Sequence, residues 1–308
     1  MSKHRFSGVI APVMTPFGPN GDPDPDRFVA HATWLLDNGC SALAPFGTTS
    51  EANSLGLDER MELLEELIDG GIDPVKLMPG TGNCSTTDAA ILTQHAVDNG
   101  CAGVLVLPPF YYKSPSEDGV FQYYADVIDE VADDDLQVYL YHIPQMSGVP
   151  LTVPLIGRLL KEFPDTIRGI KDSAGDWANM QAVMTAYPQL EFVPGSESLL
   201  LPALKAGAAG VISANANINA AAMRDLIADQ AGAGAEARQA ALSGFRTIMQ
   251  TQPLIPILKG LLAHYRNDPD WAFVRPPLAS LAPDVVAGVA RELTAKYGFA
   301  PVFNDAGA

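Results

Sequence analysis

The sequence predicts a (β/α)8 barrel with a helical region appended at its C-terminal end. Short apolar segments alternate with segments of helical pattern, and the alternation occurs eight times within about 230 residues. The strand-like segments stop at the small-residue run 231–235, and the pattern after it is helical. We therefore expect a barrel domain at 1–230 and a helical region at 231–308.

Eight segments are expected to form the strands of the barrel. Several of them are apolar throughout, which is typical of parallel strands covered on both faces. In chain order they are Gly8–Thr15, Ser41–Phe46, Val75–Gly80, Gly103–Pro108, Gln137–Ile143, Ile167–Lys171, Glu191–Pro194 and Gly210–Ala214.

Helices are expected between the strands and after the last strand. A doubly wound open sheet is the alternative, but the glycine-rich dinucleotide-binding motif expected after its first strand is missing. The clearest helical segments are Asp26–Asn38, Leu57–Ile68, Thr86–Asn99, Glu117–Val131, Glu236–Tyr265 and Pro283–Tyr297.

Composition and charge narrow the class of protein. The 308 residues include 19 Lys+Arg and 36 Asp+Glu, a net charge of -17, so nucleic acid and anionic membranes are poor candidate partners. No stretch reaches the roughly 18 apolar residues that a membrane span needs. The segment Met1–Phe6 lacks the apolar core of a signal peptide. These features predict a cytoplasmic protein, in which Cys40, Cys84 and Cys101 are expected to be buried thiols.

One lysine is the first candidate for chemistry. Reactive residues of such barrels lie at the C-terminal ends of the strands and on the loops that follow. Of the eight lysines, only Lys171 closes an apolar strand. Burial there disfavours the charged amine, and a neutral amine can attack a ketone to form an iminium that withdraws electrons from a neighbouring carbon–carbon bond. The alternative is a lysine at the barrel mouth that only pairs with a carboxylate.

Two further strand ends carry polar groups. The second strand closes with Gly47-Thr48-Thr49-Ser50-Glu51, whose N–H and hydroxyl donors could hold a carboxylate, although such a turn taken alone is more often a helix cap than a binding site. The fifth strand places Tyr141 near its end, where the phenol could transfer protons or simply pack. After the fourth strand, the aromatic segment Phe110–Tyr112 is expected to form a lid or a subunit contact.

These motifs resemble the dihydrodipicolinate synthase/N-acetylneuraminate lyase family, and the resemblance covers essentially the whole chain. Its specific parts are Gly47-Thr48-Thr49-Ser50-Glu51, Tyr111-Tyr112, Tyr141-His142-Ile143-Pro144, Gly169-Ile170-Lys171-Asp172, Gly195-Ser196-Glu197 and Gly210-Val211-Ile212-Ser213.

The resemblance implies a mechanism and its residues. Lys171 would form an imine with the keto carbon of pyruvate or of a longer 2-oxo acid. Tyr141 would act as general acid and base, in a relay with Thr48 and with Tyr112 from a neighbouring subunit. Members of the family are commonly homotetramers built from two tight dimers, and they need no metal and no organic cofactor.

The same resemblance implies the substrate contacts. Thr48 and Thr49 would bind the substrate carboxylate, and Ile212 would offer its backbone carbonyl. Gly195 and Glu197 are expected to line the substrate. We therefore expect a lyase that acts on a small-molecule 2-oxo acid.

Departures from the family pattern bear on the second substrate. Met146 stands where the synthases carry an arginine for the carboxylate of aspartate semialdehyde, and Ser50 replaces a usual glycine, which is expected to narrow the turn. None of the eleven arginines closes a predicted strand, so only Lys113 or Gln145 could compensate. Met146 and Glu197 are closer to the sugar-acid aldolases and dehydratases, which we expect to be the subgroup. A 4-hydroxy-tetrahydrodipicolinate synthase is the alternative.

The sequence disfavours three other functions. A metal-dependent aldolase is disfavoured, since the five histidines show no ligand spacing. The run Gly207–Gly210 resembles the approach to a phosphate site, but it leads into its strand from the opposite end of the barrel, where a turn explains it. A non-catalytic barrel that binds a 2-oxo acid would not need the set Lys171, Tyr141 and Thr48.

Overall fold

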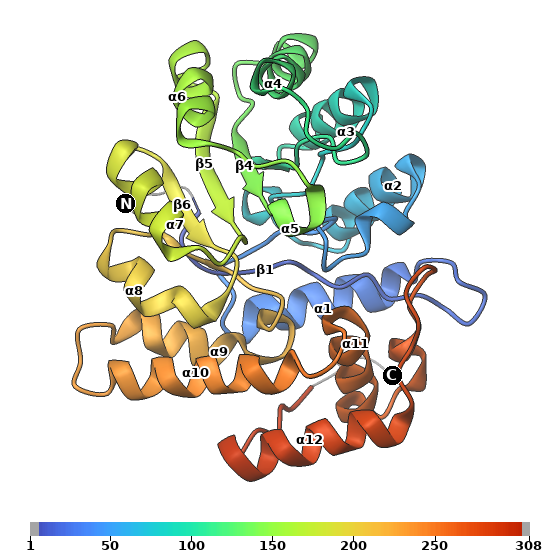
Figure 1. The fold of residues 1–308 in the computed structure, drawn as a ribbon. Coiled ribbons are helices and arrows are strands. Elements are labelled where there is room, and N and C mark those ends of the chain that lie inside the picture. The colour runs from blue at the N-terminus through green and yellow to red at the C-terminus, as the bar shows by residue number, and fades with distance from the viewer. Residues whose placement is uncertain (1–5, 304–308) are drawn as a thin grey trace.

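Parallel strands form a ring at the centre of the molecule, and helices lie outside it (Figure 1). The computed structural model describes residues 6–303, so the N-terminal segment on which the expectation about a signal peptide depends lies almost wholly outside the described residues. The strands are β1 (Gly8–Ala11), β2 (Ala42–Leu43), β3 (Val104–Val106), β4 (Val138–His142), β5 (Ile167–Asp172), β6 (Glu191–Pro194) and β7 (Gly210–Ile212).

The strands pair in parallel in the orders β2-β1-β7 and β3-β4-β5-β6. The amide of Ala209 donates to Phe192 O at 2.9 Å and joins the start of β7 to β6. The remaining gap, between β2 and β3, is filled by residues 77–80: Met78 N donates to Leu43 O at 2.8 Å, and Leu105 N donates to Pro79 O at 2.9 Å. The chain therefore closes the predicted eight-stranded barrel.

The prediction of a strand from Val75 is wrong at its start. Residues Pro74–Lys76 form a 3-10 turn, η2, because Asp73 accepts the Val75 N–H at 3.1 Å and Pro74 suits a first helical position. Only the last four residues of the predicted segment Val75–Gly80 pair with the neighbouring strands.

Most predicted helices agree with the structure to within one residue at each end. The helices between strands are α1 (Pro25–Asp37), α2 (Leu57–Asp69), α3 (Thr86–Asp98), α4 (Glu117–Val131), α5 (Pro144–Ser147), α6 (Val153–Glu162), α7 (Trp177–Ala186), α8 (Leu200–Lys205) and α9 (Ala216–Ala228). The C-terminal helices are α10 (Ala235–Met249), α11 (Leu254–Arg266) and α12 (Pro283–Tyr297), and the other 3-10 turns are η1 (Ala52–Ser54), η3 (Glu197–Leu199) and η4 (Pro269–Ala272).

The single helix predicted over Glu236–Tyr265 is wrong. The chain breaks it into α10 and α11 at Pro253, which has no N–H to continue the helical hydrogen bonds and instead precedes the first residue of α11. The break lets the chain turn sharply, so that α10 and α11 run in different directions (Figure 1).

The C-terminal helices share a hydrophobic core with the barrel. Met14 and Ile218 of the barrel are buried against Leu258 and Leu261 of α11 and Val289 of α12. The division at residue 230 stays a prediction, and this shared core ties the two parts together.

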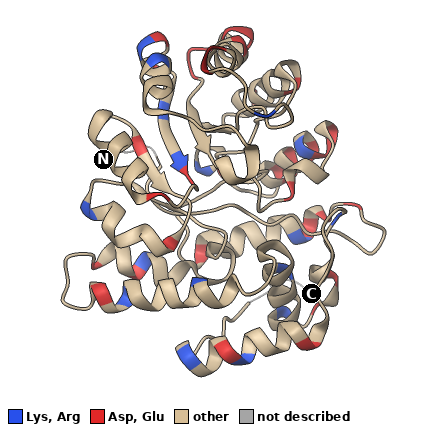
Figure 2. Cartoon of the chain, in the orientation of Figure 1, with Lys and Arg blue, Asp and Glu red and all other residues tan. Residues whose placement is uncertain are grey.

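Charge lies chiefly on the outer helices, where acidic and basic residues alternate in small groups (Figure 2). Among the described residues, no helix is both long and apolar enough to cross a membrane. Cys40 and Cys101 are buried as predicted, and burial raises the pKa of each thiol to about 12. The same prediction is wrong for Cys84, which is exposed at the start of α3.

Candidate active site

Lys171 and Tyr141 face each other inside the barrel. They are register partners on the neighbouring parallel strands β5 and β4, so both side chains point to the same side of the sheet. Lys171 Nζ lies 4.0 Å from the centre of the Tyr141 ring, and each residue is only 4% exposed. An amine and a phenol are thus held together in a nearly dry position.

The next residues of both strands point the other way. His142 Nδ1 and Asp172 Oδ2 are 3.1 Å apart in the layer between strands and helices. The Asp172 carboxylate also accepts the Ala174 N–H at 2.8 Å and the Asn179 amide at 3.2 Å. The pair therefore fixes the loop that follows Lys171 and does not enter the cavity beside it.

The turn after β2 brings a hydroxyl to the same place. Thr48 Oγ1 lies 3.1 Å from the Tyr141 hydroxyl, and either group can donate. A hydrogen bond from the segment that follows β1 holds the turn in place: the Thr15 hydroxyl donates to Ser50 O at 2.8 Å. Ser50, which we expected to narrow the turn, accepts the Gly47 N–H on its own hydroxyl at 3.3 Å.

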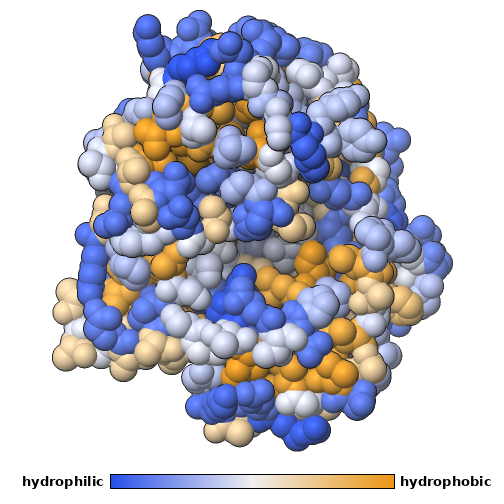
Figure 3. All heavy atoms as spheres, in the orientation of Figure 1, coloured by the Kyte–Doolittle hydropathy of each residue, from blue (hydrophilic) through white to orange (hydrophobic). Residues whose placement is uncertain are grey.

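These side chains open onto a cavity of about 480 Å³ at the C-terminal ends of the strands. The molecule is hollowed near the centre of the face that Figure 3 shows. Six predicted site residues line the cavity: Lys171, Tyr141, Thr48, Thr49, Ile212 and Gly195. Its other lining residues are Pro12, Ile143, Gln145, Ser173, Ala174, Gly175, Ser196, Ser198, Leu199, Ala214, Arg246, Gln250 and Leu254.

Gly195 has a steric reason to be glycine. A Cβ at this position would lie 2.0 Å from the Ser173 hydroxyl oxygen. The Gly195 N–H donates to Asp172 O at 2.6 Å, which draws the ends of β5 and β6 together. The cavity floor beside Lys171 depends on this close approach.

Three predicted site residues are not among those lining the cavity. Met146 is 62% exposed on α5, because its short helix turns the side chain outward. Glu197 is fully buried: it accepts a hydrogen bond from the Ser213 hydroxyl and another from Asn215 Nδ2 at 2.5 Å. Tyr112 is 79% exposed, with its ring edge-on to Tyr111.

Arg246 was missed by the sequence reasoning. It lines the cavity from α10, so the expectation that no arginine reaches this face is wrong. A signal was present in the helical pattern, because Arg246 lies four residues after Leu242 and three before Met249, both buried. An arginine on the apolar stripe of a helix indicates a guanidinium turned toward the protein. We call Arg246, Gln250 and Leu254 the helical wall of the cavity, and Lys171, Tyr141 and Thr48 the barrel wall.

The two residues expected to compensate for a missing arginine have other partners. Lys113 donates to the carbonyl oxygens of Phe110 and Ser147, at 3.2 Å for the latter. Gln145 lines the cavity, but its amide donates to Ser173 O at 2.7 Å.

A buried ion pair ties the carboxylate turn to α11. Lys259 Nζ lies 2.5 Å from Glu51 Oε1, and both side chains are fully buried. Lys259 also donates to Phe273 O at 2.7 Å, and Glu51 Oε2 accepts the Arg275 N–H at 2.9 Å. Burial lowers the Lys259 pKa to about 8 despite the neighbouring carboxylate, so desolvation outweighs the ion pair.

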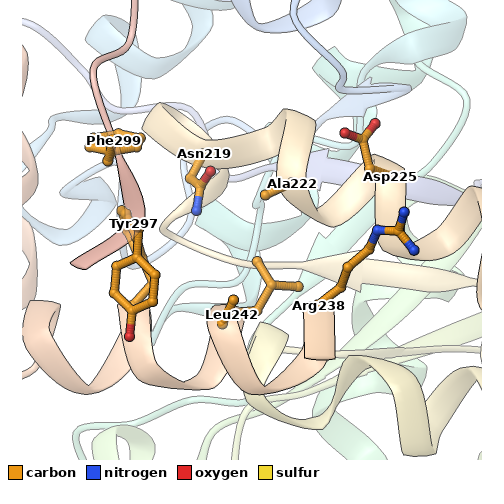
Figure 4. A pocket seen from close by; sticks show the side chains of 9 residues that line it. Asn219, Ala222, Asp225, Arg238, Leu242, Tyr297 and Phe299 are labelled. Carbon is orange, nitrogen blue, oxygen red and sulfur yellow. The ribbon is translucent and has the colours of Figure 1, made fainter. Parts of the chain in front are cut away.

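A second cavity, of about 250 Å³, lies between α9, α10 and the C-terminal segment (Figure 4). Its charged lining residues are Asp225 and Arg238, and Arg238 pairs with Asp229 at 2.7 Å. Within residues 6–303, no three His, Cys, Asp or Glu side chains gather in a way that could hold a metal ion. The cavity around Lys171 is therefore the candidate active site.

Known proteins with similar sequences and structures indicate the family of the chain. An uncharacterized DapA-like lyase of Chloroflexus aurantiacus is 35% identical over 284 residues, which is 92% of this chain and 94% of the relative. The crystal structure of dihydrodipicolinate synthase from Agrobacterium tumefaciens superposes with a TM-score of 0.88 at 30% identity, over 95% of this chain and 100% of that one. YagE of Escherichia coli K12, solved in complex with pyruvate, gives 0.87 at 27% identity, over 94% of this chain and 98% of that one.

The match to a whole family is equally extensive. The model of the Dihydrodipicolinate synthetase family covers residues 5–296. Together with the barrel and the relatives above, this match shows that the chain is a lyase and belongs to the dihydrodipicolinate synthase/N-acetylneuraminate lyase family.

Proposed function

We propose that Lys171 forms a Schiff base with the keto carbon of a 2-oxo acid. The observation that carries the proposal is the meeting of an amine, a phenol and a hydroxyl in one cavity, with Lys171 Nζ 4.0 Å from the Tyr141 ring and the Tyr141 hydroxyl 3.1 Å from Thr48. The neutral amine attacks the carbonyl carbon, water leaves, and an iminium remains. The iminium accepts the electron pair released when the bond between C3 and C4 breaks.

The neighbouring groups have separate tasks in this proposal. The turn at Thr48 and Thr49 holds the substrate carboxylate by hydroxyl and backbone N–H donors. Tyr141 gives a proton to the carbinolamine hydroxyl as it leaves as water and takes the proton of the C4 hydroxyl as C4 becomes the aldehyde, and Thr48 is the group through which the Tyr141 proton is exchanged. Ile212 and Gly195 contact the substrate, since both line the cavity.

Borohydride trapping tests the Schiff base. Reduction in the presence of pyruvate is expected to leave a 1-carboxyethyl group on the Lys171 amine, the mass of pyruvic acid less water plus two hydrogens, and Lys171→Ala is expected to abolish this label. Lys161→Ala, which removes an exposed lysine on α6, is the matched control and should keep it. Labelling at another lysine, or no labelling with any 2-oxo acid, would contradict the mechanism.

For the substrate, we propose a hydroxylated 2-oxo acid of the sugar-acid type, processed by aldol cleavage or dehydration. Met146 offers no donor and points away from the cavity, which supports this subgroup. The alternative is 4-hydroxy-tetrahydrodipicolinate synthase, and Arg246 is the observation that favours it, because an arginine could hold the carboxylate of aspartate semialdehyde. Initial rates with hydroxylated 2-oxo acids and with aspartate semialdehyde distinguish the two functions. Saturable condensation of pyruvate with micromolar aspartate semialdehyde would identify the synthase.

We propose further that the enzyme is a cytoplasmic homotetramer, a dimer of dimers, in which Tyr112 enters a neighbouring active site. The edge-on pair of Tyr111 and Tyr112 is exposed, as aromatic residues at a subunit contact would be in a single chain. Co-expressed Tyr112→Phe and Lys171→Ala chains should then regain about a quarter of parental activity, since half of the dimers are mixed and each has one complete site. No recovery in the mixed oligomer would place Tyr112 outside the site.

A further inference from the structure

Arg246 is a second cation of the cavity around Lys171. Of the described residues that line this cavity, only Lys171 and Arg246 carry charge, and none is acidic. The chain as a whole has a net charge of -17, so this arrangement runs against the overall field. A locally positive cavity in an acidic protein indicates an anionic ligand.

The guanidinium of Arg246 has unused donors. Its Nε and Nη1 are buried and have no hydrogen-bond partner among residues 6–303, and the side chain is 12% exposed. The carboxylate nearest to it in an ion pair, Glu197 Oε2, lies 3.6 Å from Nη1, which is beyond hydrogen-bond distance. Buried donors of a charged group are rarely left unpaired, because they have lost their hydrogen bonds to water without replacement.

Glu197 explains how the arginine stays in place. Its carboxylate is occupied by Ser213 and Asn215, so it attracts the guanidinium without saturating it. We assign Glu197 the role of a positioning residue for Arg246, instead of the direct substrate contact that its motif suggested.

Arg246 and Lys171 are carried by opposite parts of the structure. Lys171 comes from the barrel wall, whereas Arg246 comes from α10, with Gln250 one helical turn further along the same wall. A ligand joined covalently to Lys171 near one end would therefore meet the guanidinium with its other end.

We propose that Arg246 binds a second anionic group, at the end of the substrate remote from the keto carbon. This inference rests on the proposed Schiff-base function and specifies its substrate class: a 2-oxo acid, or the aldehyde released from it, that ends in a carboxylate or a phosphate. The planar fork of N–H donors in arginine fits both groups in a paired geometry.

Three six-carbon 3-deoxy-2-oxo acids that differ only at C6 test the proposal: the primary alcohol, the carboxylate and the phosphate ester. The parental enzyme should prefer one or both anionic forms, and the preferred arm tells carboxylate from phosphate. In Arg246→Gln, the ratio of kcat/KM for the preferred anionic form to that for the alcohol should fall about 10- to 100-fold, the worth of a charge-assisted hydrogen bond. Arg246→Lys keeps the charge but loses the fork, and it should lower the ratio by an intermediate factor even if the glutamine variant folds poorly.

The matched control is Arg238→Gln, which removes a surface arginine from the same helix, about two turns earlier. Its ratio should equal the parental one. Trapping of pyruvate on the parental enzyme tests the Schiff-base function separately from the anion subsite. If Lys171 is labelled but the ratio is unchanged in both Arg246 variants, only the anion subsite is wrong; if Lys171 is not labelled, the Schiff-base function itself is wrong.

Discussion

The two walls of the cavity are built in different ways. On the barrel wall, Lys171 and Tyr141 are fixed by strand register, because neighbouring parallel strands place register partners on one side of the sheet. On the helical wall, Arg246 is fixed by the packing of α10 and by its attraction to Glu197. Under the proposed function, the barrel wall would carry out the reaction and the helical wall would bind the end of the substrate remote from the keto carbon.

Two buried pairs of polar side chains brace the barrel wall. His142 and Asp172 lie behind the barrel wall and hold the loop after Lys171. Glu51 and Lys259 join the carboxylate turn to α11, so the C-terminal helices also brace the barrel wall. Changes on the barrel wall should therefore alter turnover with little effect on stability, and changes at the Lys259 contact should alter stability.

The largest expected effect comes from the barrel wall. Tyr141→Phe keeps the ring against Lys171 but removes the hydroxyl 3.1 Å from Thr48. We expect kcat to fall by about 100- to 10,000-fold, the usual contribution of a positioned acid or base, while pyruvate is still trapped at Lys171. Steady-state rates and mass spectrometry measure both quantities.

Tyr187→Phe is the control for that substitution. It removes a phenol that donates to Val153 O at 2.8 Å, in the helical layer outside the barrel. The control should keep parental turnover. If the Tyr141→Phe enzyme kept the parental rate, Tyr141 would be a packing residue with no role in proton transfer.

The two walls also differ in how far the sequence could predict them. Lys171 was identified because it alone among the lysines closes an apolar strand, and strand ends in a barrel meet at one face. Short strands such as β2 were harder to delimit, since only two of the six predicted residues are in the ladder. The turn at η2 was missed because the cap formed by Asp73 outweighed the apolar pattern after it.

Arg246 could not be placed by such local rules. Its position depends on where α10 ends and on the break at Pro253, which the helical pattern alone did not reveal. It also depends on Glu197, 49 positions earlier, whose burial follows from contacts with Ser213 and Asn215. Contacts between elements so far apart in sequence have no periodic signature, and the helical wall therefore became visible only in the folded chain.

The smallest expected effect concerns stability at the junction of the two walls. Burial lowers the Lys259 pKa to about 8 in the folded protein, from 10.5 in the unfolded chain. Between these values the unfolded chain binds more protons than the folded one, so the free energy of unfolding should rise with pH. For this residue we expect a gain of about 2 kcal/mol between pH 7.5 and pH 9.5, measured by chemical unfolding.

Lys259→Met isolates this contribution from opposing ones. The thiols of Cys40 and Cys101 have raised pKa values in the folded protein, so they lower stability as the pH rises above about 9. The two thiols lower the stability of the parent and of the variant equally. Their effect therefore cancels when the unfolding free energy of the variant is subtracted from that of the parent. The parental unfolding free energy minus that of the variant should increase with pH if the folded protein lowers the Lys259 pKa. Burial and the nearby Arg275 lower this pKa, and Glu51 raises it. A difference that stays constant or shrinks would mean that the ion pair outweighs burial, and the helices would then brace the carboxylate turn through a pair that stabilises the charged lysine.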